Sequence, residues 1–296
     1  MIVKSELDNN MSNSFTKSGS TIPSIGLGTW ELNGSDCLRV VAEALEIGYR
    51  HIDSAAMYEN ESEVGSAIIN SGVHREDIFL ATKINTISWT PSNPKVATLK
   101  NKDISKSLEK SLKDLQTEYV DLLLIHWPKF ETNLGDMLEI LYKLKDAKKV
   151  KEVGVANFNS NLLNECINLG FKDIFCNQVE YHPFLSQAKL LEVMQDLDII
   201  PVAYCPICRG DVARHDVIIE LAEKYSKTPA QIALRWIYQQ NLVSIPKTAN
   251  SYRLRENIDI FDFEIESKDM LKIYNLDRKQ RLVPNLEINE LEYPFD

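Results

Sequence analysis

The chain has 296 residues, of which 44% are hydrophobic and 26% charged, as is ordinary for a globular protein with a substantial core. This length exceeds one average domain but is normal for a single α/β barrel. The formal net charge of −10 at pH 7 argues against nonspecific nucleic-acid binding, because neutralising phosphates requires a basic face.

Composition also bears on where the protein works. No stretch approaches the roughly 20 apolar residues of a membrane span. The five cysteines are spaced irregularly, which favours a reducing compartment over a disulfide framework. Residues 1–13 are polar and lack the apolar run of a secretory signal. We therefore expect a cytoplasmic protein with no membrane or nucleic-acid partner, in which residues 1–14 form a disordered tail and residues 15–296 a single domain.

Short apolar runs alternate with amphipathic segments along the chain. The apolar runs predict strands over 21–27, 49–52, 78–81, 119–125, 150–155, 174–179, 199–204 and 242–245. The amphipathic segments predict helices over 37–47, 61–70, 104–115, 138–148, 161–169, 187–195, 217–225, 230–238 and 252–258. Most strand runs are continuously apolar, as in strands buried on both faces. About eight βα units without a break in composition predict an α/β fold, the (β/α)8 TIM barrel.

Two long connections interrupt this alternation, at 84–102 and 279–296. Loops of this length in a compact domain are usually functional or disordered. We expect the barrel to carry an N-terminal hairpin and long loops at its C-terminal face.

Four polar side chains stand at or just past the ends of predicted strands: Asp53, Tyr58, Lys83 and His126. Strand ends meet at one mouth of a parallel barrel, where such folds assemble their chemistry. A phenol with a pKa of about 10 is a poor acid at neutral pH, and a nearby ammonium lowers that pKa. We predict that Lys83 lowers the pKa of Tyr58 and that Asp53 holds Lys83 in place. His126 would orient a substrate oxygen.

Taken singly, each of these residues has a purely structural interpretation: a turn or cap aspartate, a packed tyrosine, a solvated lysine and a histidine on the barrel rim. Together they suit protonation of the alkoxide that forms when a hydride attacks a carbonyl carbon. The joint pattern therefore favours a proton-donating site.

Four motifs resemble signatures of the aldo-keto reductases: residues 48–55 (GYRHIDSA) with Tyr58 and Glu61, 123–128 (LLIHWP), 177–183 (NQVEYHP) and 245–247 (IPK). The resemblance extends over about residues 18–278 and is nearest in character to 2,5-diketogluconate reductase-like and aldehyde reductase-like members. It implies a (β/α)8 barrel that reduces aldehydes or activated ketones with NADPH. Tyr58 would be the general acid, tuned by Asp53 and Lys83, and His126 would position the carbonyl. The Lys83–His126 spacing is longer than the family norm, and the surplus in 84–102 is expected to alter a pocket wall.

The cofactor is not predicted to bind a Rossmann motif, because Gly26-Leu27-Gly28 lacks the third glycine of Gly-x-Gly-x-x-Gly. A late cluster instead combines two cations with a predicted helix start, which favours phosphate. By resemblance, this cluster holds the adenosine 2′-phosphate and adenine of NADPH; its residues are Lys247, Thr248, Arg253, Glu256 and Asn257.

The nicotinamide end is assigned only by resemblance. Asn157 and Gln178 would hold the carboxamide, Ala156 stands where serine is usual, and Tyr204 would stack on the ring. The remaining cofactor contacts would come from Thr29, Trp30, Asp53, Cys205, Pro206, Ile207, Arg209 and Gly210. The substrate pocket would be framed by Trp30, Tyr58, His126 and Trp127, with Trp89 in the long loop left unplaced.

Other functions were weighed against this one. Cys205-Pro206-Ile207-Cys208 is a Cys-x-x-Cys that resembles a redox motif, but it follows the seventh strand of a barrel and no further ligands at suitable spacing support zinc. No metal is expected. The principal alternative is a catalytically idle NADPH-binding barrel that serves as a sensor or structural subunit. A phosphate-binding lyase or isomerase would have no use for the Lys83–Tyr58 pair. Nothing in the sequence requires more than a monomer acting on a small carbonyl compound.

Overall fold

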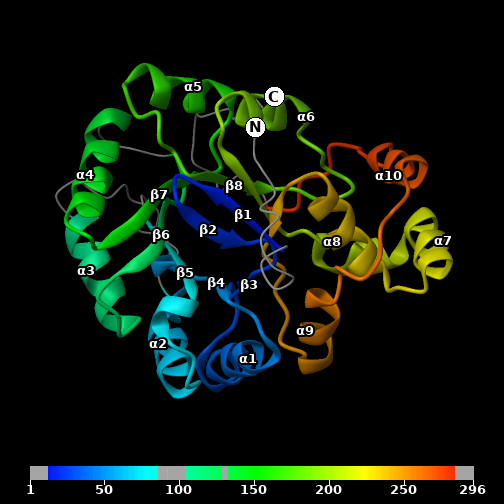
Figure 1. Ribbon diagram of the computed structural model, residues 1–296, viewed down its shortest axis with the longest axis horizontal. Helices are drawn as coiled ribbons and strands as arrows, with labels where there is room; N and C mark the ends of the chain where they lie inside the picture. The colour runs from blue at the N-terminus through cyan, green and yellow to red at the C-terminus, as the bar shows by residue number, and fades with distance from the viewer. Residues whose placement is uncertain (1–12, 86–91, 93–103, 129–132, 284–296) are drawn as a thin grey trace.

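The computed structural model describes residues 13–85, 92, 104–128 and 133–283, and it contains eight parallel strands surrounded by helices (Figure 1). The strands follow one another in chain order around the sheet. They are β3 (Leu27–Gly28), β4 (His51–Asp53), β5 (Phe79–Ile84), β6 (Val120–Ile125), β7 (Val150–Ala156), β8 (Cys176–Glu180), β9 (Ile200–Tyr204) and β10 (Val243–Ser244).

Hydrogen bonds across the seam close this sheet into the predicted (β/α)8 barrel. The segment before β3 meets β10 through a parallel bridge between Ile25 and Ser244. The Gly26 amide donates to the Ser244 carbonyl at 2.8 Å, and the Gly28 amide donates to the Pro246 carbonyl at 3.1 Å. A side chain at Gly28 would come within 2.9 Å of the Ile245 carbonyl oxygen, so glycine permits this close approach.

Most of the helices cover the outside of the barrel and bury their apolar faces against it (Figure 1). The predicted helix at 138–148 begins a turn earlier, because the Asn133 side chain caps it by accepting from the Asp136 amide at 2.8 Å. The helices are α1 (Gly34–Ile47), α2 (Glu61–Asn70), α3 (Ile104–Asp114), α4 (Leu134–Asp146), α5 (Ser160–Asn168), α6 (Ala188–Asp196), α7 (Asp216–Tyr225), α8 (Pro229–Gln239), α9 (Ser251–Ile258) and α10 (Ser267–Tyr274). Short 3-10 turns lie at η1 (Ala56–Tyr58), η2 (Arg75–Asp77) and η4 (Cys208–Arg214). None of the helices within the described ranges is long and apolar enough to span a bilayer.

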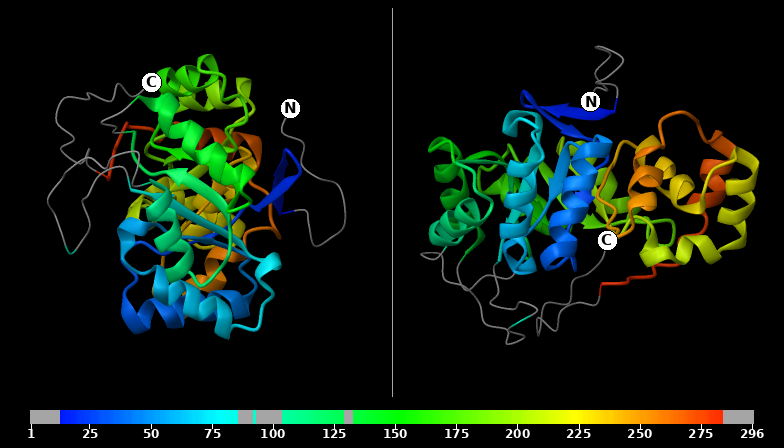
Figure 2. Two further views of the ribbon diagram at one scale, coloured as in Figure 1. Left: turned by 90° about the vertical axis from the view of Figure 1, so that its left-hand side faces the viewer. Right: turned by 90° about the horizontal axis from the view of Figure 1, so that it is seen from below.

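An antiparallel hairpin, β1 (Ser14–Lys17) and β2 (Ser20–Pro23), covers the N-terminal end of the barrel (Figure 2). Its two-residue turn, Ser18 and Gly19, has φ of 52° and 84°, the positive values that tight hairpins require. The single strand predicted over 21–27 was therefore wrong: it divides between β2 and β3. Ser14, which the sequence placed in the tail, is the first residue of β1.

The opposite end of the barrel is where the carboxyl ends of β3 to β10 meet. The chain leaving α10 runs along this face, on the far side of the molecule from the hairpin (Figure 2). The expected long loop at 84–102, with Trp89, lies outside the described residues apart from Asn85 and Ser92 and the end of β5. The described part of this face therefore consists of the strand ends, their short loops and the segment up to Val283.

Candidate active site

The four residues singled out in the sequence lie together at the carboxyl ends of three neighbouring strands. Asp53 is the last residue of β4, Lys83 lies in β5, and His126 directly follows β6. Tyr58 ends η1, the turn that follows β4. Asp53 and Lys83 are each 1% exposed, so this ion pair is shielded from water, whereas Tyr58 is partly exposed.

Lys83 joins the aspartate to the tyrosine. Its Nζ lies 2.5 Å from Asp53 Oδ1 and 3.4 Å from the Tyr58 hydroxyl oxygen. A third hydrogen bond, to the Ser54 carbonyl at 2.8 Å, satisfies the rest of the ammonium. The predicted holding of Lys83 by Asp53 is thus present in the geometry.

Asp53 is held from both sides. Its second oxygen, Oδ2, accepts from Gln178 Nε2 at 2.8 Å. Thr29 donates from both its amide and its hydroxyl to the Asp53 carbonyl, at 3.0 and 3.1 Å. Asn60, which the sequence did not single out, fixes the Thr29 carbonyl with its side-chain amide at 2.8 Å. A hydrogen-bonded shell therefore sets the position of the carboxylate.

Burial controls the ionisation of Tyr58. It raises the pKa of the phenol well above 10, and the Asp53 charge acts in the same direction. The expected lowering of this pKa by Lys83 was wrong: desolvation dominates, and the lysine charge is already balanced by Asp53 2.5 Å away. Burial likewise lowers the pKa of Lys83, opposed by Asp53.

His126 lies beside the tyrosine, with ring centroids 5.7 Å apart. Burial first, and then the Lys83 charge, lowers the pKa of this imidazole well below its usual range, so the ring is neutral at physiological pH. Its Nδ1 is buried and makes no hydrogen bond with any residue in the described ranges. Trp30 and Trp127 flank the pair, with Trp30 4.9 Å from the Tyr58 ring and Trp127 6.1 Å from the imidazole.

The residues assigned to the nicotinamide end also converge on this mouth. Asn157 directly follows β7 with φ of 63°, and its side chain accepts from the Tyr204 hydroxyl at 2.8 Å. The same side chain donates to the His126 carbonyl at 2.9 Å. Ala156 pairs in register with Gln178, so a serine hydroxyl is missing beside the proposed carboxamide position.

The late cluster extends from the loop after β10 into α9, with Arg253 in the first turn of the helix and Glu256 and Asn257 in its last turn. Lys247 lies three residues beyond the end of this strand. Asn250 caps the helix by accepting from the amides of Tyr252 and Arg253. Neither Lys247 nor Arg253 forms an ion pair with a residue that the structure describes. Thr248 and Asn257 are buried in this cluster, whereas Glu256 is half-buried.

The Cys-x-x-Cys segment forms a tight turn after β9. The Cys208 amide donates to the Cys205 carbonyl at 2.9 Å, and both cysteines are free. Burial raises the pKa of Cys205 to about 11 and that of Cys208 to about 12, so neither is a thiolate at neutral pH. Arg209 and Gly210 continue the turn with φ of 52° and 97°. Within the described ranges no group of three His, Cys, Asp or Glu is placed to hold a metal ion.

The sequence missed one part of this mouth, the segment after α10. The amides of Leu282 and Val283 donate to the Glu180 carboxylate. Val283 packs against the apolar cluster of Ala55, Met57 and Trp127, as Tyr58 also does. Glu180 lies in the 177–183 motif, but the motif alone does not predict a role for this carboxylate. No local pattern predicts the contact of Leu282 and Val283 with Glu180, because it joins positions about a hundred residues apart.

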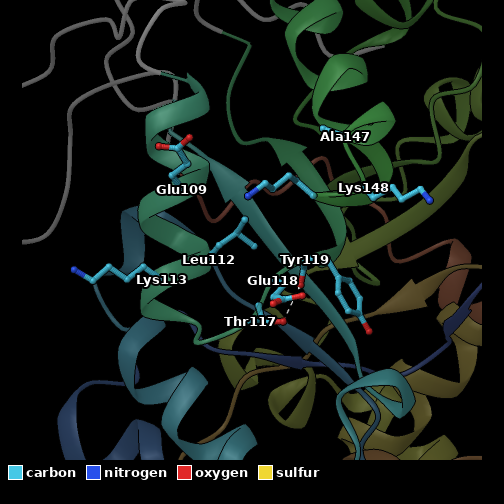
Figure 3. A pocket seen from close by; sticks show the side chains of 9 residues that line it. Glu109, Leu112, Lys113, Thr117, Glu118, Tyr119, Ala147 and Lys148 are labelled. Atoms are coloured by element: carbon cyan, nitrogen blue, oxygen red, sulfur yellow. Dashed lines mark hydrogen bonds between the residues drawn. The ribbon is translucent and has the colours of Figure 1, made fainter.

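A separate hollow of about 550 Å³ lies on the outside of the barrel beside α3 (Figure 3). It includes residues that precede β6 and β7, and so lies towards their amino ends, away from Tyr58. It is open and mixed in charge, and contains none of the residues predicted for a site. Its lining is Glu109, Leu112, Lys113, Thr117, Glu118, Tyr119, Ala147, Lys148 and Lys149.

Comparison with known proteins agrees with this geometry. A model described as the Aldo/keto reductase family matches residues 24–278. The chain is 40% identical over 268 residues to an aldo-keto reductase of Mycolicibacterium smegmatis, covering 90% of this chain and 94% of the relative. It is 38% identical over 268 residues to the glyoxal reductase of Bacillus subtilis, covering 90% and 93%. A solved structure assigned to a 2,5-diketo-D-gluconic acid reductase B is 36% identical with a TM-score of 0.82, covering 89% of this chain and 92% of that one.

The fold and the mouth define a (β/α)8 barrel with an aspartate–lysine–tyrosine–histidine cluster at its carboxyl end, in which Asp53, Lys83 and His126 are buried. The chain belongs to the aldo/keto reductase family. It is accordingly an oxidoreductase of small carbonyl compounds, in a family whose members use nicotinamide cofactors.

Proposed function

We propose that this protein is an NADPH-dependent reductase of aldehydes and activated ketones in which Tyr58 is the general acid. One observation carries the proposal: a single buried ammonium, Lys83 Nζ, lies 2.5 Å from Asp53 Oδ1 and 3.4 Å from the Tyr58 hydroxyl oxygen. This arrangement serves a phenol that must give up its proton and be stabilised as the anion.

Tyr58 is suited to donate because burial keeps it protonated. Once the proton has left, the phenolate lies against the Lys83 ammonium, whose attraction is strengthened by the exclusion of water. The Asp53 carboxylate holds that ammonium in place. Both the reactant and the product forms of the acid thus have a stabilising environment.

His126 is suited to orient the substrate rather than to protonate it. Burial and the Lys83 charge lower its pKa, so the ring remains neutral and presents one N–H donor. A neutral donor beside Tyr58 can hold a carbonyl oxygen without competing for the role of acid. The flanking rings of Trp30 and Trp127 would bound the remainder of the substrate.

The residues present fit a phosphorylated dinucleotide. On a chain with a net charge of −10, Lys247 and Arg253 remain without an acidic partner in the described ranges, at the start of α9. Unpaired cations beside a helix start favour a phosphate, and arginine favours it by bidentate bonding. When bound, NADPH supplies the hydride. Lys247, Thr248 and Arg253 would hold its 2′-phosphate, and Glu256 and Asn257 its adenine.

The same fit extends to the nicotinamide end. Tyr204 would stack on the ring, and Asn157 and Gln178 would hold the carboxamide. Asn157 is fixed by Tyr204 and by the His126 carbonyl, and so stands ready with a defined orientation. Thr29, Trp30 and Asp53 would lie beside the ring, and the turn of Cys205, Pro206, Ile207, Arg209 and Gly210 would cover the pyrophosphate.

The relatives support small dicarbonyl or aldehyde substrates, since glyoxal reductase and a 2,5-diketo-D-gluconic acid reductase are among them. The test is NADPH oxidation, followed at 340 nm, against a panel of aldehydes, α-diketones and keto sugars. We expect turnover with at least the smallest activated carbonyls. NADPH binding without oxidation of any compound would instead favour the idle barrel that serves as a sensor.

A further inference from the structure

Residues 277–283, here called the C-terminal strap, cross the carboxyl face of the barrel without forming a helix or strand. The strap leaves α10 and ends beside the proposed active site, where Val283 contacts the cluster of Ala55, Met57 and Trp127 together with Tyr58. An irregular segment holds such a position only if other groups fix its backbone.

Glu180 provides that fixation from the end of β8. Its Oε1 accepts from the Leu282 amide at 2.6 Å, and its Oε2 accepts from the Val283 amide at 3.1 Å. The carboxylate is fully buried, and a buried carboxylate is tolerated only when hydrogen bonds satisfy it. Two of its donors are consecutive amides of the strap, so the carboxylate and the strap stabilise each other.

His182 also holds the Glu180 carboxylate in place, by donating to one of its oxygens. His182 Nδ1 accepts from the Phe184 amide at 3.3 Å, which leaves its proton on Nε2 to donate to Glu180 Oε1 at 3.1 Å. Phe184 in turn accepts from the amides of Arg278 and Gln280, at 3.3 and 3.0 Å. The loop after β8 therefore anchors the strap at two points, and the buried carboxylate is the one next to the active site.

We propose that Glu180 is a positioning residue for substrate selection: it holds Val283 as a wall of the substrate pocket beside Tyr58. This inference rests on the proposed function, because it concerns which carbonyl compounds reach the tyrosine. Glu180 acts through the backbone of the strap, and Val283 makes the apolar contact with substrate.

Three variants test the proposal: Glu180→Gln, Val283→Ala and the double variant. Glutamine is nearly isosteric but replaces one acceptor oxygen with an N–H donor, which cannot pair with a strap amide. We expect backbone amide exchange in the peptide spanning 276–283 to accelerate at least tenfold in Glu180→Gln. The matched control is Glu152→Gln, which removes a similarly buried carboxyl at β7, hydrogen-bonded to Ser20 and Lys145, and should leave exchange at 276–283 unchanged.

The kinetic readout compares a bulky aromatic aldehyde with a two-carbon aldehyde. In Glu180→Gln and in Val283→Ala, KM for the bulky substrate should rise about five- to tenfold, the loss expected from removing an apolar contact of one or two methyl groups. The kcat values and the KM for the small aldehyde should stay within twofold in Glu180→Gln. The double variant should show no more than the larger single effect, because both changes remove the same wall.

Unchanged amide exchange in Glu180→Gln would overturn the anchoring role, and unchanged selectivity despite faster exchange would overturn the role in substrate choice. Additive effects in the double variant would also overturn it, since they would mean that Glu180 does not act through Val283. If Glu180→Gln fails to fold, Val283→Trp tests the wall directly: it should exclude the bulky aldehyde, and acceptance of that aldehyde would refute the proposal. Absence of any carbonyl reduction by the unaltered protein refutes the proposed function alone, because the exchange experiment does not depend on turnover.

Discussion

Replacing Tyr58 with phenylalanine removes one oxygen from a site whose packing is otherwise preserved. The ring contacts, at 4.9 Å to Trp30 and 5.7 Å to His126, involve atoms that phenylalanine retains. The hydroxyl oxygen receives one long hydrogen bond, 3.4 Å from Lys83 Nζ. Losing such a bond costs about 1 kcal/mol or less of unfolding free energy. The variant should therefore fold normally and bind NADPH with unchanged affinity.

The effect on catalysis should be much larger. General acid catalysis contributes about 10²- to 10⁴-fold, which is roughly 3–5 kcal/mol of barrier. His126 cannot replace the lost acid, because its lowered pKa leaves no protonated imidazole at neutral pH. The assay is single-turnover oxidation of bound NADPH, which avoids any limit set by product release. A Phe variant that retains more than a tenth of the unaltered rate would refute the assignment of Tyr58 as proton donor.

The pH dependence of the same rate tests the electrostatic argument. Burial raises the pKa of Tyr58 well above 10, so the phenol remains protonated and the single-turnover rate should be flat from about pH 6 to pH 9. If Lys83 instead lowered this pKa into that range, the rate would fall as pH rises and the phenol ionises. A falling limb below pH 9 would show that binding of ligands reverses the effect of burial.

Three further outcomes are expected. Arg253→Met should raise KM for NADPH about 10- to 100-fold and leave KM for NADH unchanged, because a charge-assisted bond to phosphate contributes about 1.5–3 kcal/mol; equal losses with both cofactors would refute the 2′-phosphate assignment. Ala156→Ser should tighten NADPH binding by about 1 kcal/mol, measured by fluorescence titration, if a hydroxyl beside Gln178 reaches the carboxamide. Burial lowers the pKa of His51 to about 4. Between pH 6.5 and pH 4 the unfolded chain therefore takes up a proton that the folded protein does not, and the free energy of unfolding decreases as the pH is lowered. This contribution, about 3 kcal/mol at pH 4, should be the difference between the unaltered protein and His51→Gln in how far urea stability drops from pH 6.5 to pH 4.

The barrel was largely predictable from sequence because its strands are apolar and its helices amphipathic. Where the prediction was wrong, a contact distant in sequence decided the structure. The run at 21–27 is uniformly strand-like, yet its first part pairs with Ser14–Lys17 in the hairpin, and only Leu27–Gly28 joins the barrel beside β4. Local hydrophobicity does not distinguish these two partners.

The candidate site, like the barrel, was predicted correctly in part. The convergence of Asp53, Lys83 and His126 followed from their places at strand ends, and the structure brings them together. The direction of the Tyr58 pKa did not follow, because a sequence does not reveal how completely water is excluded. The role inferred for Glu180 could not be predicted from the sequence either, because its partners in the strap are backbone amides, which do not depend on the side chain at those positions.

The two kinds of contact at this mouth differ in how readily they can change. Asp53 has both carboxylate oxygens occupied, by Lys83 at 2.5 Å and Gln178 at 2.8 Å, so a substitution at any of the three leaves a buried polar group without its partner. The wall at Val283, in contrast, is attached through main-chain amides, which persist whatever side chain the strap carries. Substitutions at position 283 should therefore alter the choice of substrate without disturbing the proton donor. The proposed chemistry is fixed by side chains on strands, and the proposed selectivity is adjusted on a segment that a single buried carboxylate holds in place.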